Sequence, residues 1–444
     1  MARSLSAEEF FSTWQHALQS DFIKDGQSAT YFPGHPKQWG DEIACIDFEG
    51  TIALNDDGSL LGISNLNGEA RIYDVPSFTL WRTLKGPRST RSGRPIHFQP
   101  GRGKVLVGGD LIMQGHRIRH WIKCHELKEV EEADDPFKEA ANAAASVAVE
   151  NILEKGVCSR EDINRFKIHD SFHDMLSLIQ LEMWKSDMFE GSFVSGRTFS
   201  RDGSFFLYRN TKNAIVVLDS ESLQERYILA GHTDHIAWAE TSPDDTVIAT
   251  SSWDQTVRIW DAVNGQQLRI LTGATSQLWS GAFSPDGKLV CVGCGGEDPK
   301  VRLWEVESGE LLHELGRFRR WTRALAFSPD GRSIAAGSGN GVLKVFDAVS
   351  GKEKQHWQVK CLDPLASGFI EIQSVRYTSK GLLVFNYTDG RVYTYNEEMN
   401  KKGQYEYGPE IQLSAGYGAK LVSPDGRLLI SADFDRRVRV WSLE

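Results

Sequence analysis

The stretch Ser251-Ser252-Trp253-Asp254-Gln255-Thr256-Val257-Arg258-Ile259-Trp260-Asp261 decides the fold, because its pattern returns along the chain. Each copy has a short apolar run, a Ser-Pro-Asp-Gly turn, a second apolar run, a polar turn and a sequence similar to Val-Arg-Ile-Trp. Clear copies of the turn lie at Ser284–Gly287, Ser328–Gly331 and Ser423–Gly426. Four looser copies are centred on residues 55–58, 99–101, 200–203 and 378–381, which gives eight units with the one quoted.

Each unit predicts four strands, because apolar runs rich in Val, Ile, Phe and Trp are interrupted every eight to twelve residues or so by Pro, Asp and Gly. In the fourth unit the expected strands are Ile236–Glu240, Val247–Ser251, Val257–Trp260 and Gln267–Leu271. The Asp-Gly pair tolerates the positive φ angles of a tight turn between the first two strands. The expected fold class is therefore all-β.

Outside residues 1–27 and 131–190, the chain resembles the WD-repeat β-propeller family, most strongly in units four, five, six and eight. The resemblance implies a closed propeller with one blade per unit. Eight blades are expected, with seven as the alternative if the second unit is not a true blade. In this family a His, a Ser or Thr, an Asp and a Trp form a buried structural relay, and His232, Asp254 and Trp260 match three members. The hydroxyl belongs to Thr250 or Ser252, since residues two apart on a strand face the same way.

Other units depart from the relay pattern. Unit five has Gly273-Ala274 where Gly-His would stand, and unit six ends its third strand at Phe346. We expect these blades to rely on apolar packing instead.

The last unit ends after three strands, which leaves an edge that must be covered. Residues 29–35 have the form of an outer strand followed by Gly-His, so we expect them to close the ring. The predicted organisation is an N-terminal helix and lead-in, a closing strand with blades one and two, a helical insertion, and the remaining blades of the same propeller. These parts cover residues 1–27, 28–130, 131–190 and 191–444.

Two segments have helical rather than strand periodicity. Residues 5–23 predict an amphipathic helix, with Ser6 and Glu9 as a capping box. Between units two and three, an Ala-rich run followed by apolar residues at three- and four-residue steps predicts a small helical hairpin. Either segment could pack on the propeller or dock onto a partner.

Composition narrows the classes of protein. The 444 residues carry a net charge of -10, which argues against general binding to nucleic acid, although a local patch could still bind it. Six scattered cysteines lack zinc-finger spacing, and reduced structural thiols are expected. No stretch has the apolar length of a signal peptide core or a transmembrane segment, so the expected location is the cytoplasm or nucleus.

The loop from unit five to unit six carries the densest candidate binding chemistry. Guanidinium groups alternate there with aromatic rings, a combination that suits carboxylate, phosphate or stacked ligands. By resemblance, such loops line the narrower end of the propeller channel and bind partners. Three of the residues are also similar to the Phe-Arg-Arg signature of phosphoinositide-binding propellers, although Trp follows where that family has Gly. The candidate residues are Arg317, Phe318, Arg319, Arg320, Trp321 and Arg323.

No recognisable catalytic motif accompanies the repeats. Gly293-Cys294-Gly295-Gly296 lacks the following helix and Lys of a phosphate-binding loop, and His232 with Asp254 belongs to the expected relay. We therefore expect no catalytic residues, metal or cofactor, and a scaffold or adaptor that assembles other proteins through its loops and possibly its insertion. The alternatives are phosphoinositide, phosphopeptide or nucleic-acid binding at the Arg-rich loop, and, behind them, an enzyme with an unrecognised site.

Overall fold

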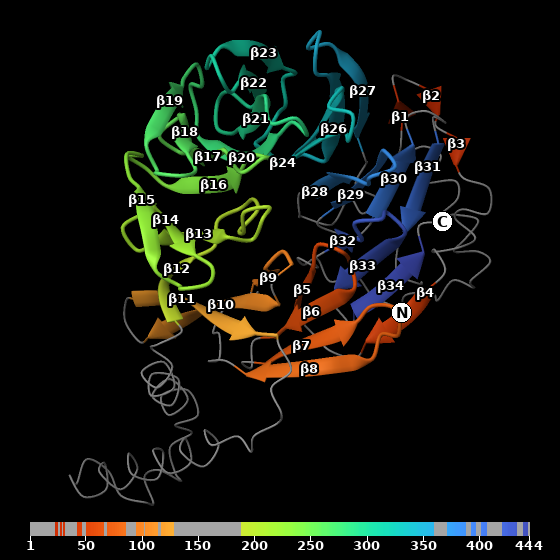
Figure 1. Cartoon of the computed structure of the whole chain (residues 1–444). Helices are drawn as coiled ribbons and strands as arrows, with labels where there is room; N and C mark the ends of the chain where they lie inside the picture. The colour runs from red at the N-terminus through yellow and green to blue at the C-terminus, as the bar shows by residue number, and fades with distance from the viewer. Residues whose placement is uncertain are drawn as a thin grey trace, which may run out of the picture.

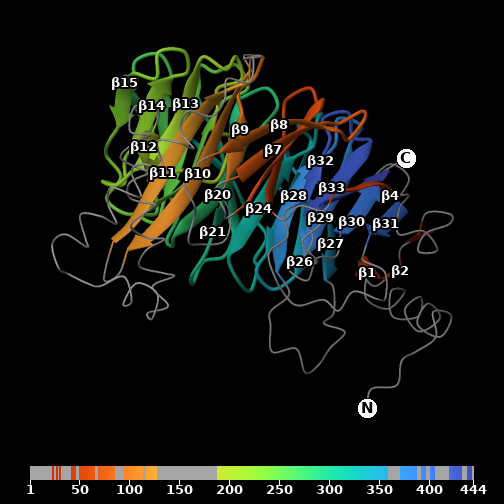
Figure 2. The same ribbon diagram turned by 90° about the horizontal axis from the view of Figure 1, so that it is seen from below.

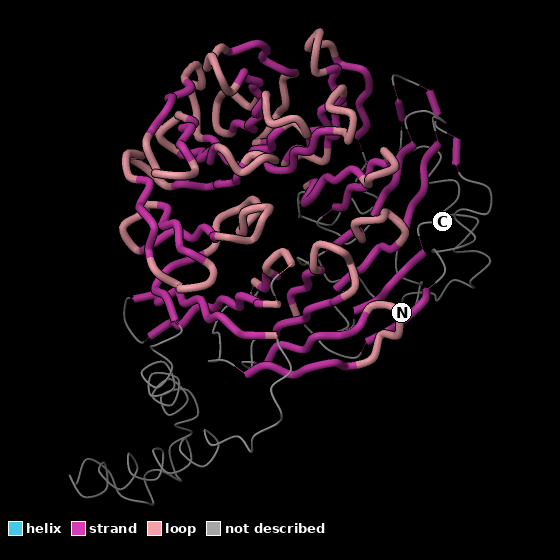
Figure 3. Tube along the Cα trace, viewed as in Figure 1, coloured by secondary structure: helices cyan, strands magenta, loops and turns pink. Residues whose placement is uncertain are grey.

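The protein is built of sheets, antiparallel except for one edge strand, that follow one another around a common centre, as the computed structural model shows (Figure 1). Every secondary-structure element in the described part of the chain is a strand (Figure 3). The structure describes residues 23–24, 27–28, 30–31, 42–46, 50–65, 69–85, 95–101, 103–113, 117–127, 188–358, 371–387, 392–396, 401–405, 420–432 and 438–442.

Four of the described sheets each contain four strands that are consecutive in the chain. They are β5 (Thr51–Leu54), β6 (Leu60–Ser64), β7 (Glu69–Asp74) and β8 (Leu80–Lys85); β16 (Ile236–Thr241), β17 (Val247–Ser252), β18 (Val257–Asp261) and β19 (Gln267–Leu271); β20 (Leu278–Phe283), β21 (Leu289–Cys294), β22 (Val301–Glu305) and β23 (Leu311–Leu315); and β24 (Thr322–Phe327), β25 (Ser333–Ser338), β26 (Val342–Asp347) and β27 (Glu353–Gln358). The strands predicted for the fourth unit agree with β16–β19 to within one residue.

The hydrophobic core lies between neighbouring sheets. Trp238 of β16 packs in one cluster with Val290 and Trp304 of the next sheet, and Trp357 of β27 packs with residues of the sheet that follows it. Figure 2 shows the sheets side by side when the ring is seen from below. Second strands such as β25 are buried along their whole length, because each is covered by a sheet on both faces.

The Ser-Pro-Asp-Gly turn joins the first strand of a sheet to the second and is held by its serine. Ser284 Oγ donates to Asp286 Oδ1 at 2.6 Å and accepts the N–H of Leu289 at 2.9 Å. Ser423 makes the same two bonds with Asp425 and Leu428, at 2.5 and 2.9 Å. The side chain thus replaces missing backbone partners at the turn.

Seven strands form one continuous sheet, and the predicted insertion falls in the sequence between two of its central strands. The strands are β9 (Ile96–Phe98), β10 (Lys104–Met113), β11 (Arg117–Glu126), β12 (Met188–Ser192), β13 (Phe205–Asn210), β14 (Ile215–Asp219) and β15 (Glu225–Leu229). β12 pairs with β11 on one side and with β13 on the other. The insertion therefore separates two paired strands of this sheet, and residues 188–190, which we had predicted to be part of it, belong to β12.

The N-terminal part of the chain supplies the outer strand of the last sheet, but with different residues from those predicted. β32 (Lys420–Val422), β33 (Leu428–Ala432) and β34 (Val438–Ser442) are followed in the sheet by β4 (Glu42–Ile46), whose Ala44 lies opposite Val440. The prediction that residues 29–35 fill this place is wrong. Thr30 and Tyr31 form β3 (Thr30–Tyr31), which runs parallel to β31 (Lys401–Tyr405) at the edge of another sheet.

That other sheet also contains β28 (Ile372–Tyr377), β29 (Leu382–Tyr387) and β30 (Val392–Asn396), while β1 (Ile23–Lys24) and β2 (Gln27–Ser28) pair only with each other. The predicted N-terminal helix and the predicted helical hairpin lie outside the described residues, except that Ile23 belongs to β1 and residues 188–190 to β12. The described residues include no helix of the length and apolarity needed to cross a membrane.

Deletion of residues 1–46 removes β4 and leaves the backbone groups of β34 unpaired beside buried Val438 and Val440. We expect the deletion to lower the free energy of unfolding by about 3 kcal/mol or more, since a row of hydrogen bonds and apolar contacts is lost. The measurement is urea denaturation of purified protein. A chain lacking only residues 1–28 keeps β3 and β4 and is the control; equal losses in the two deletions would contradict the pairing of β4 with β34.

Candidate functional site

The sheets β16–β19, β20–β23 and β24–β27 correspond to the fourth, fifth and sixth units of the sequence and are called the fourth, fifth and sixth sheets. The fourth sheet contains a complete buried hydrogen-bond relay. His232 Nδ1 lies 2.7 Å from Asp254 Oδ2, His232 Nε2 lies 2.7 Å from Thr250 Oγ1, and the Trp260 indole N–H donates to the same Thr250 oxygen at 2.9 Å. Ser252 serves another purpose, because its Oγ donates to the carbonyl of Asp234. Of the two hydroxyls allowed by the sequence, Thr250 therefore lies in the relay.

Protonation of the relay follows from its burial. The His232 side chain is 1% exposed and that of Asp254 6%. Burial lowers the pKa of His232, although Asp254 acts in the opposite direction. Burial alone would raise the pKa of Asp254, but hydrogen bonds from Thr256 and His232 lower it overall. A neutral imidazole then donates Nδ1–H to Asp254 and accepts the Thr250 hydroxyl, which satisfies every polar atom of the relay but leaves none facing a substrate.

The fifth sheet replaces the relay with a buried arginine, in contrast to the predicted apolar packing. Arg302 on β22 donates from Nη1 to Cys294 Sγ at 3.0 Å and from Nη2 to Asp298 and to Glu314 Oε1, the latter at 2.8 Å. Burial raises the pKa of the Cys294 thiol to about 11, so this sulfur accepts the hydrogen bond as a neutral, unreactive group. In the sixth sheet the prediction of apolar packing agrees with the contact of Phe346 with Phe318.

At the end of the ring where the inner strands β16, β20 and β24 begin, aromatic rings and guanidinium groups form one continuous stack. The Trp253 and Trp279 rings are 4.9 Å apart, and Arg323 Cζ lies 4.2 Å from the Trp279 ring and 4.8 Å from that of Trp321. The His235 ring lies 4.6 Å from Trp253 at one end, and Arg320 Cζ lies 5.4 Å from Trp321 at the other. Distances of this size are those of stacking and cation–π contacts.

Arg209 of β13 extends the stack to a further sheet. Its Nη1 lies 2.8 Å from His235 Nε2 and donates to the carbonyl of Ile236 at 2.6 Å. Burial and the nearby Arg209 lower the pKa of His235, so this imidazole accepts the bond as a neutral ring. We call the whole set the aromatic ladder: Arg209, His235, Trp253, Trp279, Arg323, Trp321 and Arg320.

Two glycines make room for the ladder. A Cβ on Gly295 would lie 2.4 Å from the Trp279 indole nitrogen, and one on Gly339 would lie 2.3 Å from that of Trp321. Each indole is half-buried over its glycine, and its N–H edge is buried without a hydrogen-bond partner. The parts of these side chains that remain accessible are therefore the rings, beside the exposed guanidinium group of Arg323.

The predicted Arg-rich loop divides into three groups. Trp321, Arg320 and Arg323 belong to the ladder. Phe318 is a core residue, 5% exposed and packed in the cluster that contains Phe346. Arg317 and Arg319 are exposed, and the structure gives neither a contact with the ladder.

The site predicted from the sequence lacks four of the seven ladder residues: Trp253, Trp279, His235 and Arg209. The usable signal was the pair Gly295 and Gly339, each at the turn after a second strand and each in a unit whose first strand begins next to a Trp. Among the described residues, no group of three or more His, Cys, Asp or Glu side chains is placed to hold a metal ion.

Four segments of the chain match a known repeat family. Residues 223–261, 265–305, 309–347 and 418–442 match the family model of the WD domain, G-beta repeat. These four segments of the chain are therefore WD repeats.

Three relatives share parts of the chain. Mouse coronin-7 is 43% identical over 68 residues, which are 15% of this chain and 7% of coronin-7. An uncharacterized WD repeat-containing protein of the cyanobacterium Synechocystis is 26% identical over 172 residues, 37% of this chain and 49% of the relative. The periodic tryptophan protein 2 homolog of Schizosaccharomyces pombe is 39% identical over 64 residues, 14% of this chain and 8% of that protein. This chain thus spans half or less of the length of each relative.

Replacement of Thr250 by Val should destabilise the protein more than replacement of Ser252 by Ala. The Val variant leaves His232 Nε2 and the Trp260 N–H buried without partners, a cost of about 2 kcal/mol or more, whereas Ser252→Ala should cost about 1 kcal/mol. Thr250→Ser keeps the hydroxyl and should recover most of the loss. Urea denaturation at pH 7 measures all three, and a larger loss for Ser252→Ala would contradict the assignment of Thr250.

The stabilising effect of His232 should depend on pH. Because the pKa of His232 is lowered from 6.5 in the folded protein, its contribution is complete above pH 6.5 and declines as the pH falls below that value. The difference in unfolding free energy between wild type and His232→Gln should therefore narrow from pH 7.5 to about pH 5. Urea denaturation at several pH values measures it, and a difference that widens on acidification would contradict the neutral imidazole.

Proposed function

We propose that this protein is a non-catalytic WD-repeat scaffold that binds a protein partner across the aromatic ladder. The observation that carries the proposal is the continuous stack of indole, imidazole and guanidinium groups from Arg209 to Arg320. Trp and Arg are the residues that most often dominate the binding energy of protein interfaces, especially when they are clustered and rigid.

The ring provides the rigid support that such a surface needs. We propose that the five four-stranded sheets, the five-stranded sheet and two units within the seven-stranded sheet make up eight blades, and that β4 closes the ring. Arg209, Trp279 and Arg323 lie on strands of three different sheets, and the other ladder residues lie in turns next to strand ends, so the packing of the sheets sets their spacing.

The side chains of the aromatic ladder indicate which side chains a partner should present to it. Three arginines border or interrupt the aromatic rings, so we infer a partner segment that offers both apolar or aromatic side chains and carboxylates. Arg317 and Arg319 lie exposed beside the ladder in sequence and are proposed as flanking contacts. We place the protein in the cytoplasm or nucleus, in keeping with the absence of a membrane-spanning segment from the sequence pattern.

A catalytic role for the relay is disfavoured by its geometry. His232 and Asp254 are nearly inaccessible, and their hydrogen-bonding atoms are used within the sheet. A general base must reach a substrate proton within hydrogen-bond distance, which this imidazole does not do.

The test compares two double variants in affinity purification followed by mass spectrometry. Trp279→Ala with Arg323→Ala removes the middle of the ladder, and we expect its specific partners to fall by at least about 10-fold. Trp81→Ala with Arg269→Ala is the matched control, because Trp81 and Arg269 are exposed residues of the same types on the outer strands β8 and β19.

Both double variants should keep a melting temperature close to that of wild type. If the variant with Trp279→Ala and Arg323→Ala is destabilised, the single variant Arg323→Gln replaces it in the experiment. Partners recovered equally from the ladder variant and the control would refute the proposal that the ladder is the interface.

A further inference from the structure

A cavity of about 800 Å³ lies at the centre of the ring and is lined by residues of the innermost strands. The wall contains residues of β5, β9, β16, β20, β24, β28 and β32, together with residues 195–199 and Arg201. A volume of this size is within the range of pockets that hold small molecules.

One position on the inner strands determines the chemistry of the cavity. The fifth residue of each six-residue strand is Glu240 in β16, Ala282 in β20, Ala326 in β24 and Arg376 in β28. All four line the cavity. At this position two alanines therefore stand between the two charged side chains, and each places only a methyl group there.

Cations outnumber anions in the lining, in contrast to the net charge of -10 of the whole chain. The charged lining residues are Arg197, Arg201, Arg323, Arg376, Asp56 and Glu240. Two of the arginines are engaged elsewhere. Arg197 Nη2 donates to Asp56 Oδ2 at 2.9 Å, and Arg323 lies between Trp279 and Trp321 in the ladder.

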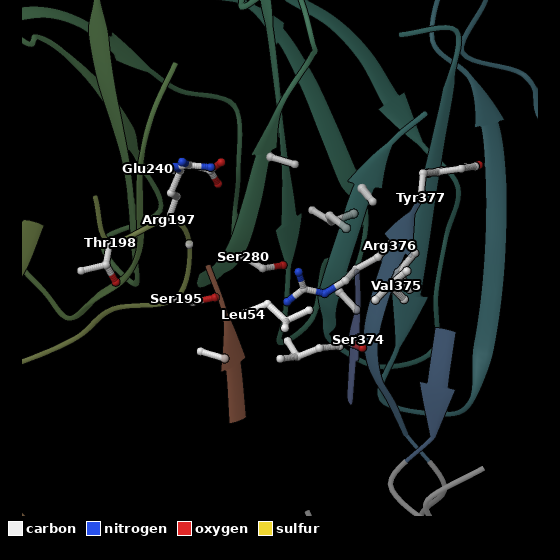
Figure 4. A pocket seen from close by; sticks show the side chains of 18 of the residues that line it. Leu54, Ser195, Arg197, Thr198, Glu240, Ser280, Ser374, Val375, Arg376 and Tyr377 are labelled. Carbon is white, nitrogen blue, oxygen red and sulfur yellow. The ribbon is translucent and has the colours of Figure 1, made fainter. Parts of the chain in front are cut away.

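The guanidinium groups of Arg201 and Arg376 have no hydrogen bond or ion pair with any described residue. Both interact with Glu240 through longer-range electrostatic attraction. Figure 4 shows the Arg376 side chain extending from β28 into the cavity. Arg376 is exposed to this interior space, while the surrounding protein lowers its pKa through partial loss of hydration. Burial raises the pKa of Glu240, while the charges of Arg201 and Arg197 act in the opposite direction.

We propose that the central cavity is a binding site for a small organic oxyanion, a carboxylate or a phosphate, held by Arg376 with Arg201 as a second cation. A guanidinium group matches two oxygens of either group with parallel N–H donors. The two alanines leave room for the body of the ligand, and the cavity size excludes a folded partner or a nucleic acid duplex. Arg323 of the ladder also lines the cavity, but the two proposed anion-binding residues, Arg376 and Arg201, do not belong to the ladder.

Isothermal titration calorimetry at constant ionic strength tests the proposal with citrate and glycerol 3-phosphate as probes and glycerol as the neutral control. We expect at least one anion, and not glycerol, to bind wild type with a Kd of about 1 mM or lower. Arg376→Gln should weaken that binding about 10-fold or more, and Arg376→Lys should weaken it less, because the charge remains without the two-pronged geometry. Glu240→Gln should strengthen it, since a repelling carboxylate is removed.

Arg269→Gln on the outer strand β19 should leave the affinity unchanged and controls for overall charge. If Arg376→Gln does not fold, Arg201→Gln in an exposed turn takes its place. Binding of citrate alone or of glycerol 3-phosphate alone supports the site and identifies the anion class. The proposal is overturned if neither anion binds wild type up to about 10 mM, or if wild type and the arginine variant bind equally. Neither result depends on the outcome of the ladder experiment.

Discussion

The turn between the first and second strands of a sheet is the constraint on which the rest of the structure depends. Its serine, aspartate and positive-φ glycine, as in Ser284, Asp286 and Gly287, bind the turn to itself and fix which residues of the two strands lie opposite each other. A shift of one residue would move Glu240 and Arg376 from the cavity into the packing between sheets. The same shift would place core residues in the cavity.

Register alone does not hold the sheets together. The side-chain interactions that stabilise the buried part of each sheet differ from one sheet to the next. The fourth sheet uses the relay through Thr250, the fifth uses Arg302, and the sixth uses Phe346 against Phe318. A buried charge is tolerated only when its hydrogen bonds are satisfied, which explains why Arg302 has a sulfur and two carboxylates around it. The repeated backbone thus accepts different side chains wherever each polar atom finds a partner.

The all-β fold and the strands of the fourth unit could be predicted because they depend on short patterns within one repeat. Thr250 and Ser252 could not be separated, because residues two apart on a strand share a face. The strand beside β34 was misplaced because residues 29–35 and Glu42–Ile46 both read as short extended segments, and only pairing across the whole chain distinguishes them. The ladder was found only in part for a similar reason. Trp253, Trp279 and Trp321 lie in different units, and their contacts depend on how sheets pack rather than on any local motif.

The choice of arginine over lysine connects the ladder and the cavity. An ammonium group is strongly hydrated, and placing it between two indoles or inside a partly apolar cavity would remove water without a compensating surface. A guanidinium group is planar and weakly hydrated, so Arg323 can lie against the Trp279 and Trp321 rings while it remains exposed. An acidic chain can therefore keep cationic groups at its centre and on one end without pairing each one internally. Those groups retain the capacity to bind carboxylates or phosphates that come from outside the chain.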